Sequence, residues 1–282
     1  LAGGLRQQHA FGETFGHRVV DGGSTEGSPR IAQSTGAMVT EAPGSSIYQA
    51  INIGLARAQG DFICLLNSDD RLGENALAHL SAALADPAIE LARGRARVEH
   101  RRDEGWVLSD DGAPHNPSLS LRSVLLEPAN INACMFRASL VQRIGMFDLA
   151  YPISADREWL ARALLDGAHT TPINETTYVY RAHAESVTIG MRKPATMQWV
   201  REHLAFTRQF LRRPDLRASD RAALLAFHAK ESAHLASLQL ERWELSGREL
   251  GESFAASPLW PLHAAGPLAA IAARRLKRAF SS

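Results

Sequence analysis

Acidic residues follow two apolar segments of the chain, and this placement is the first sign of chemistry in the sequence. Asp21 ends a short apolar segment, and a loop rich in Gly, Ser and Thr follows it over 22–28. Asp69 and Asp70 come shortly after a second apolar segment, 61–66. Adjacent carboxylates repel each other, so such a pair calls for a cation or for donor groups, and hard oxygen ligands suit Mg²⁺ or Mn²⁺. The alternative interpretation of the pair is a solvated acidic turn.

Two later segments carry side chains that could act on a substrate. Asp156 opens a helical pattern over 156–166. There, an aspartate is either a helix cap or a general base at the rim of a cleft, and the local sequence alone favours the cap. His183 follows an apolar segment and is either a metal ligand or phosphate donor, or an ordinary surface histidine.

Alternating strand and helix patterns position these side chains. The sequence predicts strands over 17–21 and 61–66 and helices over 45–59 and 73–85. Such alternation predicts an α/β domain with a mixed, mostly parallel sheet flanked by helices. Ligands of these sheets bind beyond the carboxyl ends of the strands, which is where both acidic clusters stand.

Composition and charge divide the chain near residue 190. Residues 1–191 carry 16 Lys and Arg against 22 Asp and Glu, whereas residues 192–282 carry 15 against 8. The second part is nearly all helical in pattern, so we expect an α/β domain over 1–190 and a basic helical region over 191–282. The basic region lacks interleaved aromatic residues, so nucleic acid is not an expected partner.

Six motifs occur in an order that resembles the family 2 glycosyltransferases of the GT-A fold. They are VVDGGST from residue 19, YQAINIG from 48, NSDD from 67, RIGMFD from 143, SADREWLAR from 154 and YRAHAESVT from 180. The resemblance covers roughly residues 5–190 and implies that the domain over 1–190 is a nucleotide-sugar-binding, catalytic domain. It implies an inverting enzyme that moves a sugar from a nucleoside-diphosphate sugar, by default a UDP-sugar, to a hydroxyl of a glycan or lipid-linked acceptor. Such an enzyme would build a cell-surface polysaccharide.

The resemblance also implies a role for each matching residue. Asp156 would be the catalytic base that takes the proton of the acceptor hydroxyl. The nucleotide and sugar contacts would come from Asp21, Gly23, Ser24, Asn52, Asp69 and His183. The ligands of a Mn²⁺ or Mg²⁺ cofactor would be Asp70, Asp69 and His183.

The chain departs from the family pattern at several positions. Gly22, Asn67 and Ala155 each stand where many members carry an acid. Leu1–Ala10 matches the helix that follows the family's first strand, so we expect that strand to be absent and an interior position of the sheet to be open. These departures keep a non-catalytic, degenerate nucleotide-sugar-binding module as an alternative function. A nucleotidyltransferase of similar fold is the other alternative.

The segment 267–280 places apolar residues at helical spacing beside four basic ones. It is interpreted either as a terminal helix packed on the catalytic domain or as a helix on an anionic membrane surface. A spanning helix is the least favoured interpretation. Cys64 and Cys134 stand in apolar context and predict buried free thiols, which suits a reducing compartment. We therefore expect a cytoplasmic protein, peripheral at the inner face of the cell membrane if the second interpretation of 267–280 holds.

Overall fold

The computed structural model describes residues 15–102, 105–109, 119–182, 193–242, 246–258 and 260–261. The chain divides into two compact units, Leu1–Ile189 and Gly190–Ser282, beside the predicted boundary at residue 190. Strands and helices alternate along the first unit, whereas the described elements of the second are helices. Each unit therefore has its own architecture.

A small parallel sheet opens the described part of the first unit. Strands β1 (Arg18–Asp21) and β2 (Met38–Glu41) pair in parallel, and α2 (Ser28–Ser34) connects them. Helix α3 (Ile47–Arg57) follows and packs against β1. A reciprocal capping box begins α3, because the side chain of Ser46 accepts from the backbone of Gln49 and the Gln49 side chain accepts from the backbone of Ser46.

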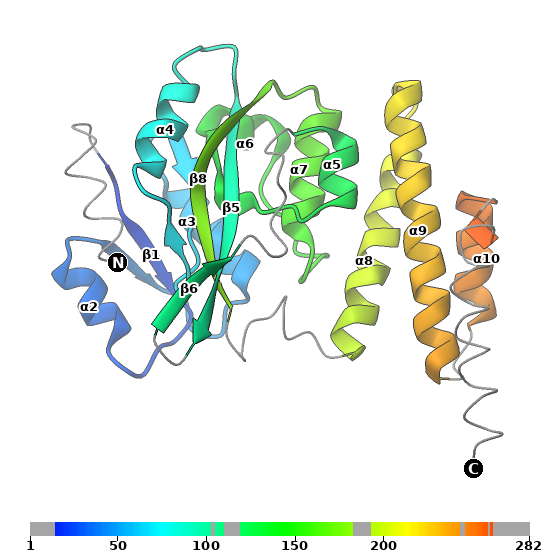
Figure 1. Ribbon diagram of the computed structural model, residues 1–282, viewed down its shortest axis with the longest axis horizontal. Helices are drawn as coiled ribbons and strands as arrows, with labels where there is room; N and C mark the ends of the chain where they lie inside the picture. Colours follow the sequence, from blue (N-terminus) through cyan, green and yellow to red (C-terminus); the bar gives the residue numbers. More distant parts are fainter. Residues whose placement is uncertain are drawn as a thin grey trace. The chain divides into compact units, whose positions relative to one another are not determined.

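A larger sheet forms the centre of the same unit (Figure 1). Its strands run in the order β3, β7, β5, β8 and β4, and β6 pairs with β5 off this path. The strand bounds are Phe62–Cys64 for β3, Cys134–Arg137 for β7, Leu91–Arg102 for β5, Thr170–Ala182 for β8, Arg71–Leu72 for β4 and Gly105–Ser109 for β6. Cys134 is a buried free thiol, and Cys64 is a half-buried one.

The sheet is mixed, as expected, but the expectation of mostly parallel strands is wrong for the described ladders. Only β1–β2 and β5–β8 are parallel, while the other four ladders are antiparallel. Strand–helix alternation predicts parallel pairing only where a helix carries the chain back across the sheet. β5 instead pairs antiparallel with β6, the next strand along the chain, and β7 also runs antiparallel to β5.

No ladder joins β1 to β3 within the described ranges, so the two sheets are separate there. The expected absence of a first strand concerns residues 1–10, which lie outside those ranges. Within the described ranges, β1 therefore pairs only with β2, and β3 pairs only with β7.

Helices cover both sides of β5 and β8 (Figure 1). Helix α4 (Ala76–Ala83) packs on one side with Leu72, Leu84, Ala92 and Met135. On the other side lie α5 (Leu121–Leu126), α6 (Ala138–Ile144) and α7 (Ala155–Leu165). The turn η1 (Ile131–Ala133) contacts β5, β8 and α7. Phe136 of β7 packs on Trp159 of α7 with ring centroids 4.8 Å apart, which anchors α7 to the sheet.

The second unit contains α8 (Lys193–Leu211), α9 (Ala218–Arg242) and α10 (Gly247–Ala256). Apolar residues of α8 and α9 meet in a cluster of Met197, Val200, Leu204 and Leu235. Trp260 packs against alanines of α9 in a second cluster. None of the described helices is long and apolar enough to cross a bilayer, and the predicted segment 267–280 lies outside the described residues.

Candidate active site

Asp21 ends β1, and its carboxylate organises the loop that follows. The backbone N–H groups of Gly23 and Ser24 donate to Asp21 Oδ2 over 3.0 and 2.9 Å, and the Ser24 hydroxyl donates to Oδ1. These donors, led by the Ser24 hydroxyl, hold the pKa of Asp21 below its usual range. Gly23 has a φ of 112°, a conformation that favours glycine. The structure therefore brings together the predicted residues Asp21, Gly23 and Ser24.

Asp70 lies among internal donors. Its Oδ2 accepts from the Tyr178 hydroxyl and from Asn67 Nδ2 at 3.1 Å, and its Oδ1 accepts from the backbone N–H of Arg181 at 2.8 Å. Burial raises the pKa of Asp70 above its usual range, although these donors oppose the shift. Asn67, which departs from the acid that the family resemblance implies, thus acts as a donor to the neighbouring carboxylate. Asp69 beside it is exposed.

A close approach of two strands creates this arrangement. A side chain at Gly73 would place its Cβ 1.8 Å from the carbonyl oxygen of Thr176 on β8, so only glycine fits there. Leu72 pairs with Tyr178 in the β4–β8 ladder, which brings the Tyr178 hydroxyl to Asp70. The tyrosine hydroxyl also lies 3.3 Å from Asn132 Nδ2.

Two arginines meet next to Asp70. Arg71 Nε and Arg181 Nε lie 3.0 and 3.2 Å from the carboxylate oxygens of Glu99 on β5. The bond to Arg71 is the main reason that the pKa of Glu99 lies below its usual range. The Arg181 guanidinium also lies over the ring of Trp106, 5.3 Å from its centroid. Positive charge is therefore fixed beside the acidic turn.

Asp156 lies in the first turn of α7 and is partly buried. Its Oδ1 accepts from the Arg157 backbone N–H at 2.8 Å, and the Tyr48 hydroxyl lies 3.1 Å from the same oxygen. Burial raises the pKa of Asp156, and the charge of Arg157 and both hydrogen bonds act against that rise. A carboxyl group with a raised pKa is better suited to accept a proton near neutral pH. The Ser154 side chain makes no cap hydrogen bond at this helix end.

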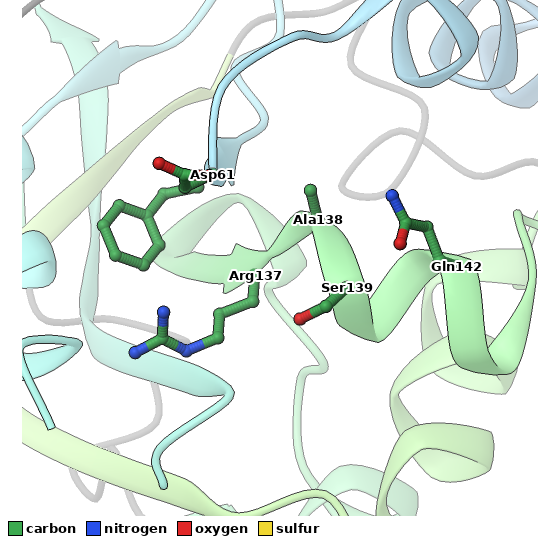
Figure 2. Close-up of a pocket in the computed structure, with 6 residues that line it drawn as sticks. Asp61, Arg137, Ala138, Ser139 and Gln142 are labelled. Carbon is green, nitrogen blue, oxygen red and sulfur yellow. The ribbon is translucent and has the colours of Figure 1, made fainter. Parts of the chain in front are cut away.

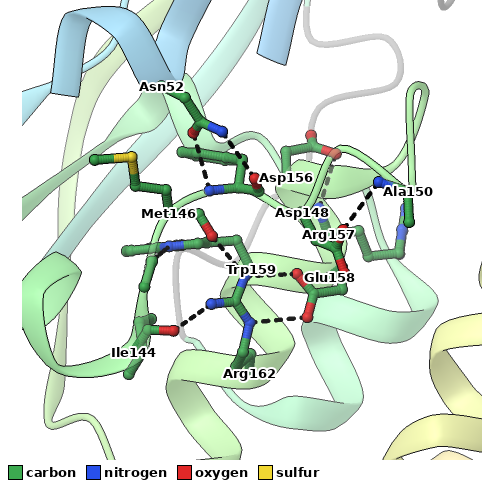
Figure 3. A network of polar contacts seen from close by, with 12 residues as sticks. Asn52, Ile144, Met146, Asp148, Ala150, Asp156, Arg157, Glu158, Trp159 and Arg162 are labelled. Carbon is green, nitrogen blue, oxygen red and sulfur yellow. Dashed lines mark hydrogen bonds and ion pairs between the residues drawn. The ribbon is translucent and has the colours of Figure 1, made fainter. Parts of the chain in front are cut away.

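The segment before α7 is held by side chains of that helix (Figure 3). Arg162 donates to the carbonyl oxygens of Ile144 and Met146 and forms an ion pair with Glu158 at 2.8 Å. Trp159 Nε1 donates to the Gly145 carbonyl at 2.9 Å. The RIGMFD and DREWLAR motifs are therefore one unit in space, in which the second motif fixes the backbone of the first.

Asn52 attaches α3 to the same segment. Its Nδ2 donates to the carbonyl oxygen of Phe147 at 2.9 Å, and its Oδ1 accepts from the Phe147 N–H at 3.0 Å. Both ends of the amide are used in this backbone contact, so the structure gives Asn52 a positioning role. The predicted contact of Asn52 with the sugar stays a prediction.

The cavity shown in Figure 2 is not lined by any of the predicted site residues. It has a volume of about 340 Å³, and its lining includes Asp61, Phe62 and Arg137. Asp61 precedes β3, whereas Asp69 and Asp70 follow it, so the cavity and the acidic turn belong to opposite ends of this strand. Arg137 donates to the backbone carbonyls of Ile89 and Leu84, so its side chain stabilises the fold. We do not assign substrate binding to this cavity.

The predicted metal ligands are only partly described. His183 lies outside the described residues. Among the residues that the structure describes, no group of three His, Cys, Asp or Glu side chains could hold a metal ion. Magnesium is commonly held by one or two carboxylates plus the phosphates of a substrate. The exposed Asp69 fits that kind of site better than Asp70, whose two oxygens already accept from the protein.

The predicted residues thus form three described groups. Asp21 groups with Gly23 and Ser24, Asp70 groups with the turn around Asp69, and α3 links Asn52 and Asp156 through Phe147 and Tyr48. Sequence reasoning missed the roles of Tyr48 and Tyr178. The signal for Tyr48 was its place in the YQAINIG motif, but its target is 108 residues away.

A mixed α/β fold with acidic turns at strand ends and a carboxylate at a helix start defines a GT-A-type domain. Residues 6–139 match the sequence model of glycosyl transferase family 2, and this match confirms the resemblance that the motifs predicted. Two proteins of Mycobacterium tuberculosis, each named an uncharacterized glycosyltransferase, are 32% identical over 159 residues. The aligned region covers 53% of this chain and 57% of each relative, so the chain spans little more than half of their length.

Solved structures agree on the fold. The crystal structure of S. aureus TarS has a TM-score of 0.61 and 15% identity, with 94% of this chain and 50% of TarS covered. A TarS 1–349 structure in complex with UDP-GlcNAc has a TM-score of 0.54 and 13% identity, with 92% of this chain and 87% of that one covered. Another TarS 1–349 structure holds UDP.

Proposed function

We propose that this chain transfers a sugar, with inversion, from a nucleoside-diphosphate sugar to a hydroxyl of a glycan or lipid-linked acceptor. The observation that carries the proposal is Asp156, a partly buried carboxyl group with a raised pKa that is fixed by a tyrosine and a backbone N–H. A uridine diphosphate sugar is the default donor, because a TarS structure of the same fold was solved with UDP-GlcNAc.

In the proposed reaction one proton is transferred, one bond forms and one bond breaks. Asp156 accepts the proton of the acceptor hydroxyl while that oxygen forms a bond to the anomeric carbon of the sugar. The bond from this carbon to the diphosphate breaks on the opposite face, and the nucleoside diphosphate leaves with the bonding electrons. Holding both substrates in line supplies much of the rate gain.

The donor would lie along the acidic strand ends. The Asp21 loop, with Gly23 and Ser24, would bind the nucleoside, and Asp69 would hold a Mn²⁺ or Mg²⁺ ion together with the donor phosphates. Such an ion, when bound, supplies charge neutralisation to the leaving diphosphate. Asp70 would keep the turn in place through Tyr178 and Arg181. Predicted roles for Asp70 and His183 as metal ligands, and for His183 near the diphosphate, stay predictions.

A cytoplasmic location with contact to an anionic membrane surface through 267–280 is part of the same proposal. A lipid-linked acceptor would be presented at such a surface, and basic residues near it gain about 1 kcal/mol each from anionic lipids. Binding to vesicles with and without anionic lipid, compared with a chain that ends before 267, tests this part.

Calorimetric binding tests the donor site. We expect one of UDP, GDP and dTDP to bind more tightly with Mn²⁺ than without it, and Asp69→Asn to lose that metal dependence. Asp61→Asn is the matched control, because it removes an exposed carboxylate at the other end of β3. Asp61→Asn behaving like Asp69→Asn, or binding of no nucleotide, would contradict the proposed donor site.

A second measurement separates catalysis from binding. Asp156→Asn should retain nucleotide binding and lose release of UDP from UDP-GlcNAc. If the wild-type chain binds nucleotide and neither hydrolyses nor transfers any sugar, the non-catalytic binding module is the better description. Formation of a nucleotide–phosphate bond in place of sugar transfer would favour the nucleotidyltransferase.

A further inference from the structure

Helix α3 presents two side chains, one turn apart, to the segment that leads into α7. Tyr48 and Asn52 are at i and i+4, so they share one face of the helix. Asn52 makes the paired backbone contact with Phe147, and the Tyr48 ring stacks on the Phe147 ring with centroids 5.7 Å apart and planes 16° apart. Phe147 in turn stacks on Trp159, with centroids 5.6 Å apart. The direction of the Tyr48 ring is therefore fixed by packing on a held backbone.

Because the Tyr48 ring is fixed, its hydroxyl is held close to Asp156. The Tyr48 oxygen lies 3.1 Å from Asp156 Oδ1 and 3.1 Å from the carbonyl oxygen of Ile153, and the tyrosine is only 7% exposed. A phenol has one proton to donate. An ionised carboxylate is a stronger acceptor than a peptide carbonyl, so the proton points to Asp156 whenever that group is charged.

Two hydrogen bonds from other residues to the Asp156 carboxylate meet the same oxygen. Oδ1 accepts from Tyr48 and from the backbone N–H of Arg157. These two donors on Oδ1 fix the orientation of the carboxylate, and neither of them is bonded to the other oxygen, Oδ2. We propose that Tyr48 is a positioning residue that holds Asp156 through Oδ1, so that Oδ2 accepts the proton of the acceptor hydroxyl. This inference rests on the proposed function of Asp156.

The inference also predicts how Tyr48 affects the pKa of Asp156, the proposed base. A donor to the ionised form stabilises that form, so removal of the donor must raise the pKa of Asp156. The ring of Tyr48 and its hydroxyl have separable roles, because stacking on Phe147 needs only the ring. A purely structural tyrosine would affect stability and leave the titration of Asp156 unchanged.

Titration of labelled aspartates by NMR tests the inference on the whole chain without any acceptor. Asp156→Asn identifies the signal of Asp156. In Tyr48→Phe we expect the midpoint of Asp156 to move up by about one pH unit, the size of a typical hydrogen bond to a charged group. Tyr180→Phe, which removes a hydroxyl from another tyrosine, should leave the midpoint unchanged. An unchanged midpoint in Tyr48→Phe overturns the inference.

A second variant guards against a folding defect. Replacement of Tyr48 by 3-fluorotyrosine keeps the ring and makes the hydroxyl a stronger donor, so the Asp156 midpoint should move down. An upward shift in the fluorinated chain, or no shift, contradicts a donor role. The two variants are therefore expected to shift the pKa of Asp156 in opposite directions.

Kinetics separate this inference from the proposed function. With UDP-GlcNAc as the probe and water as the acceptor, Tyr48→Phe should move the acid limb of kcat/KM upward by the same shift and leave the KM of the donor unchanged. If Asp156→Asn retains full activity, the proposed function fails. If Asp156→Asn is inactive and Tyr48→Phe keeps the wild-type acid limb, only the role of Tyr48 fails.

Discussion

The two units of the chain shift the pKa of an acidic side chain in opposite directions. Asp156, at the start of α7, has a raised pKa because burial outweighs the groups around it. Glu231, on α9, is 1% exposed, and burial also acts to raise its pKa. His203 and His234 outweigh that effect and hold the pKa of Glu231 below its usual range.

The difference lies in the partners. Glu231 oxygens lie 3.5 Å from His203 Nδ1, 3.7 Å from His234 Nδ1 and 3.5 Å from Lys230 Nζ, so Glu231 is surrounded by groups that carry positive charge when protonated. Asp156 has a hydroxyl and a backbone N–H as its direct donors. Burial alone therefore does not reveal what a carboxylate does. Glu231, whose burial is offset by neighbouring basic groups, stays ionised and stabilises the pair of helices α8 and α9. Asp156, whose burial is not fully offset by its donors, is better suited to accept a proton.

The largest expected effect is on activity, at Asp156. Asp156→Asn removes the proton acceptor and should lower kcat by about 10²- to 10⁴-fold, the range expected for a general base. Single-turnover release of UDP from UDP-GlcNAc measures it. Glu231→Gln should change kcat little under the same conditions. Equal losses in both variants would break the comparison between the two carboxylates.

The largest expected effect on stability is at Glu231. Glu231→Gln leaves His203 buried beside a neutral group, and loss of one partner of a buried pair costs about 3–5 kcal/mol. Urea unfolding followed by helical circular dichroism measures it. Glu252→Gln is the control, because Glu252 pairs with arginines at the surface and is 44% exposed there. Its removal should cost less than about 1 kcal/mol.

The helical unit should also lose stability in mild acid through His228. Burial, with a smaller effect of Arg208, lowers the pKa of His228 to about 4 from 6.5. Unfolding therefore takes up a proton between these values, so stability falls as the pH drops from about 6.5 to 4, by about 3 kcal/mol in all. His228→Leu should flatten this slope when urea midpoints are compared across that range. An unchanged slope would show that His228 is not buried in neutral form.

The smallest expected effect is at the start of α3. Ser46→Ala removes the capping hydrogen bond to Gln49 and should cost about 1 kcal/mol. Amide exchange in α3 measures the local loss without involving the helical unit. Ser34→Ala, a serine hydroxyl at the exposed end of α2, should change stability by less than about 0.5 kcal/mol. A similar effect of both would mean that the cap does not support α3.

Much of the fold was predictable because its signals are local. The helix at 138–144 has the predicted bounds, and the helix at 156–166 differs by one residue at each end. Pairing direction was not local: β4 is two residues long and joins the sheet only because Gly73 permits close contact with β8. No periodicity in the sequence indicates such a strand.

The candidate site shows the same limit. Asp21 and its loop could be predicted, since the donors lie two and three residues away. The partners of Asp70 and Asp156 could not, because Tyr178 and Tyr48 each lie 108 residues distant in sequence. Asn67 is an example of a departure that sequence comparison counts as a lost acid and the structure explains as a gained donor.

Helix α3 has a consequence for the order in which this molecule comes apart. It packs on β1, and it also holds Phe147 through Asn52 and Asp156 through Tyr48. Any fluctuation that unravels α3 must release all of these attachments together, since they depend on one short segment of backbone. Loss of the proton acceptor's geometry and loosening of the β1 edge should therefore be a single sub-global opening, with one common exchange rate, well before the core around Trp159 is exposed.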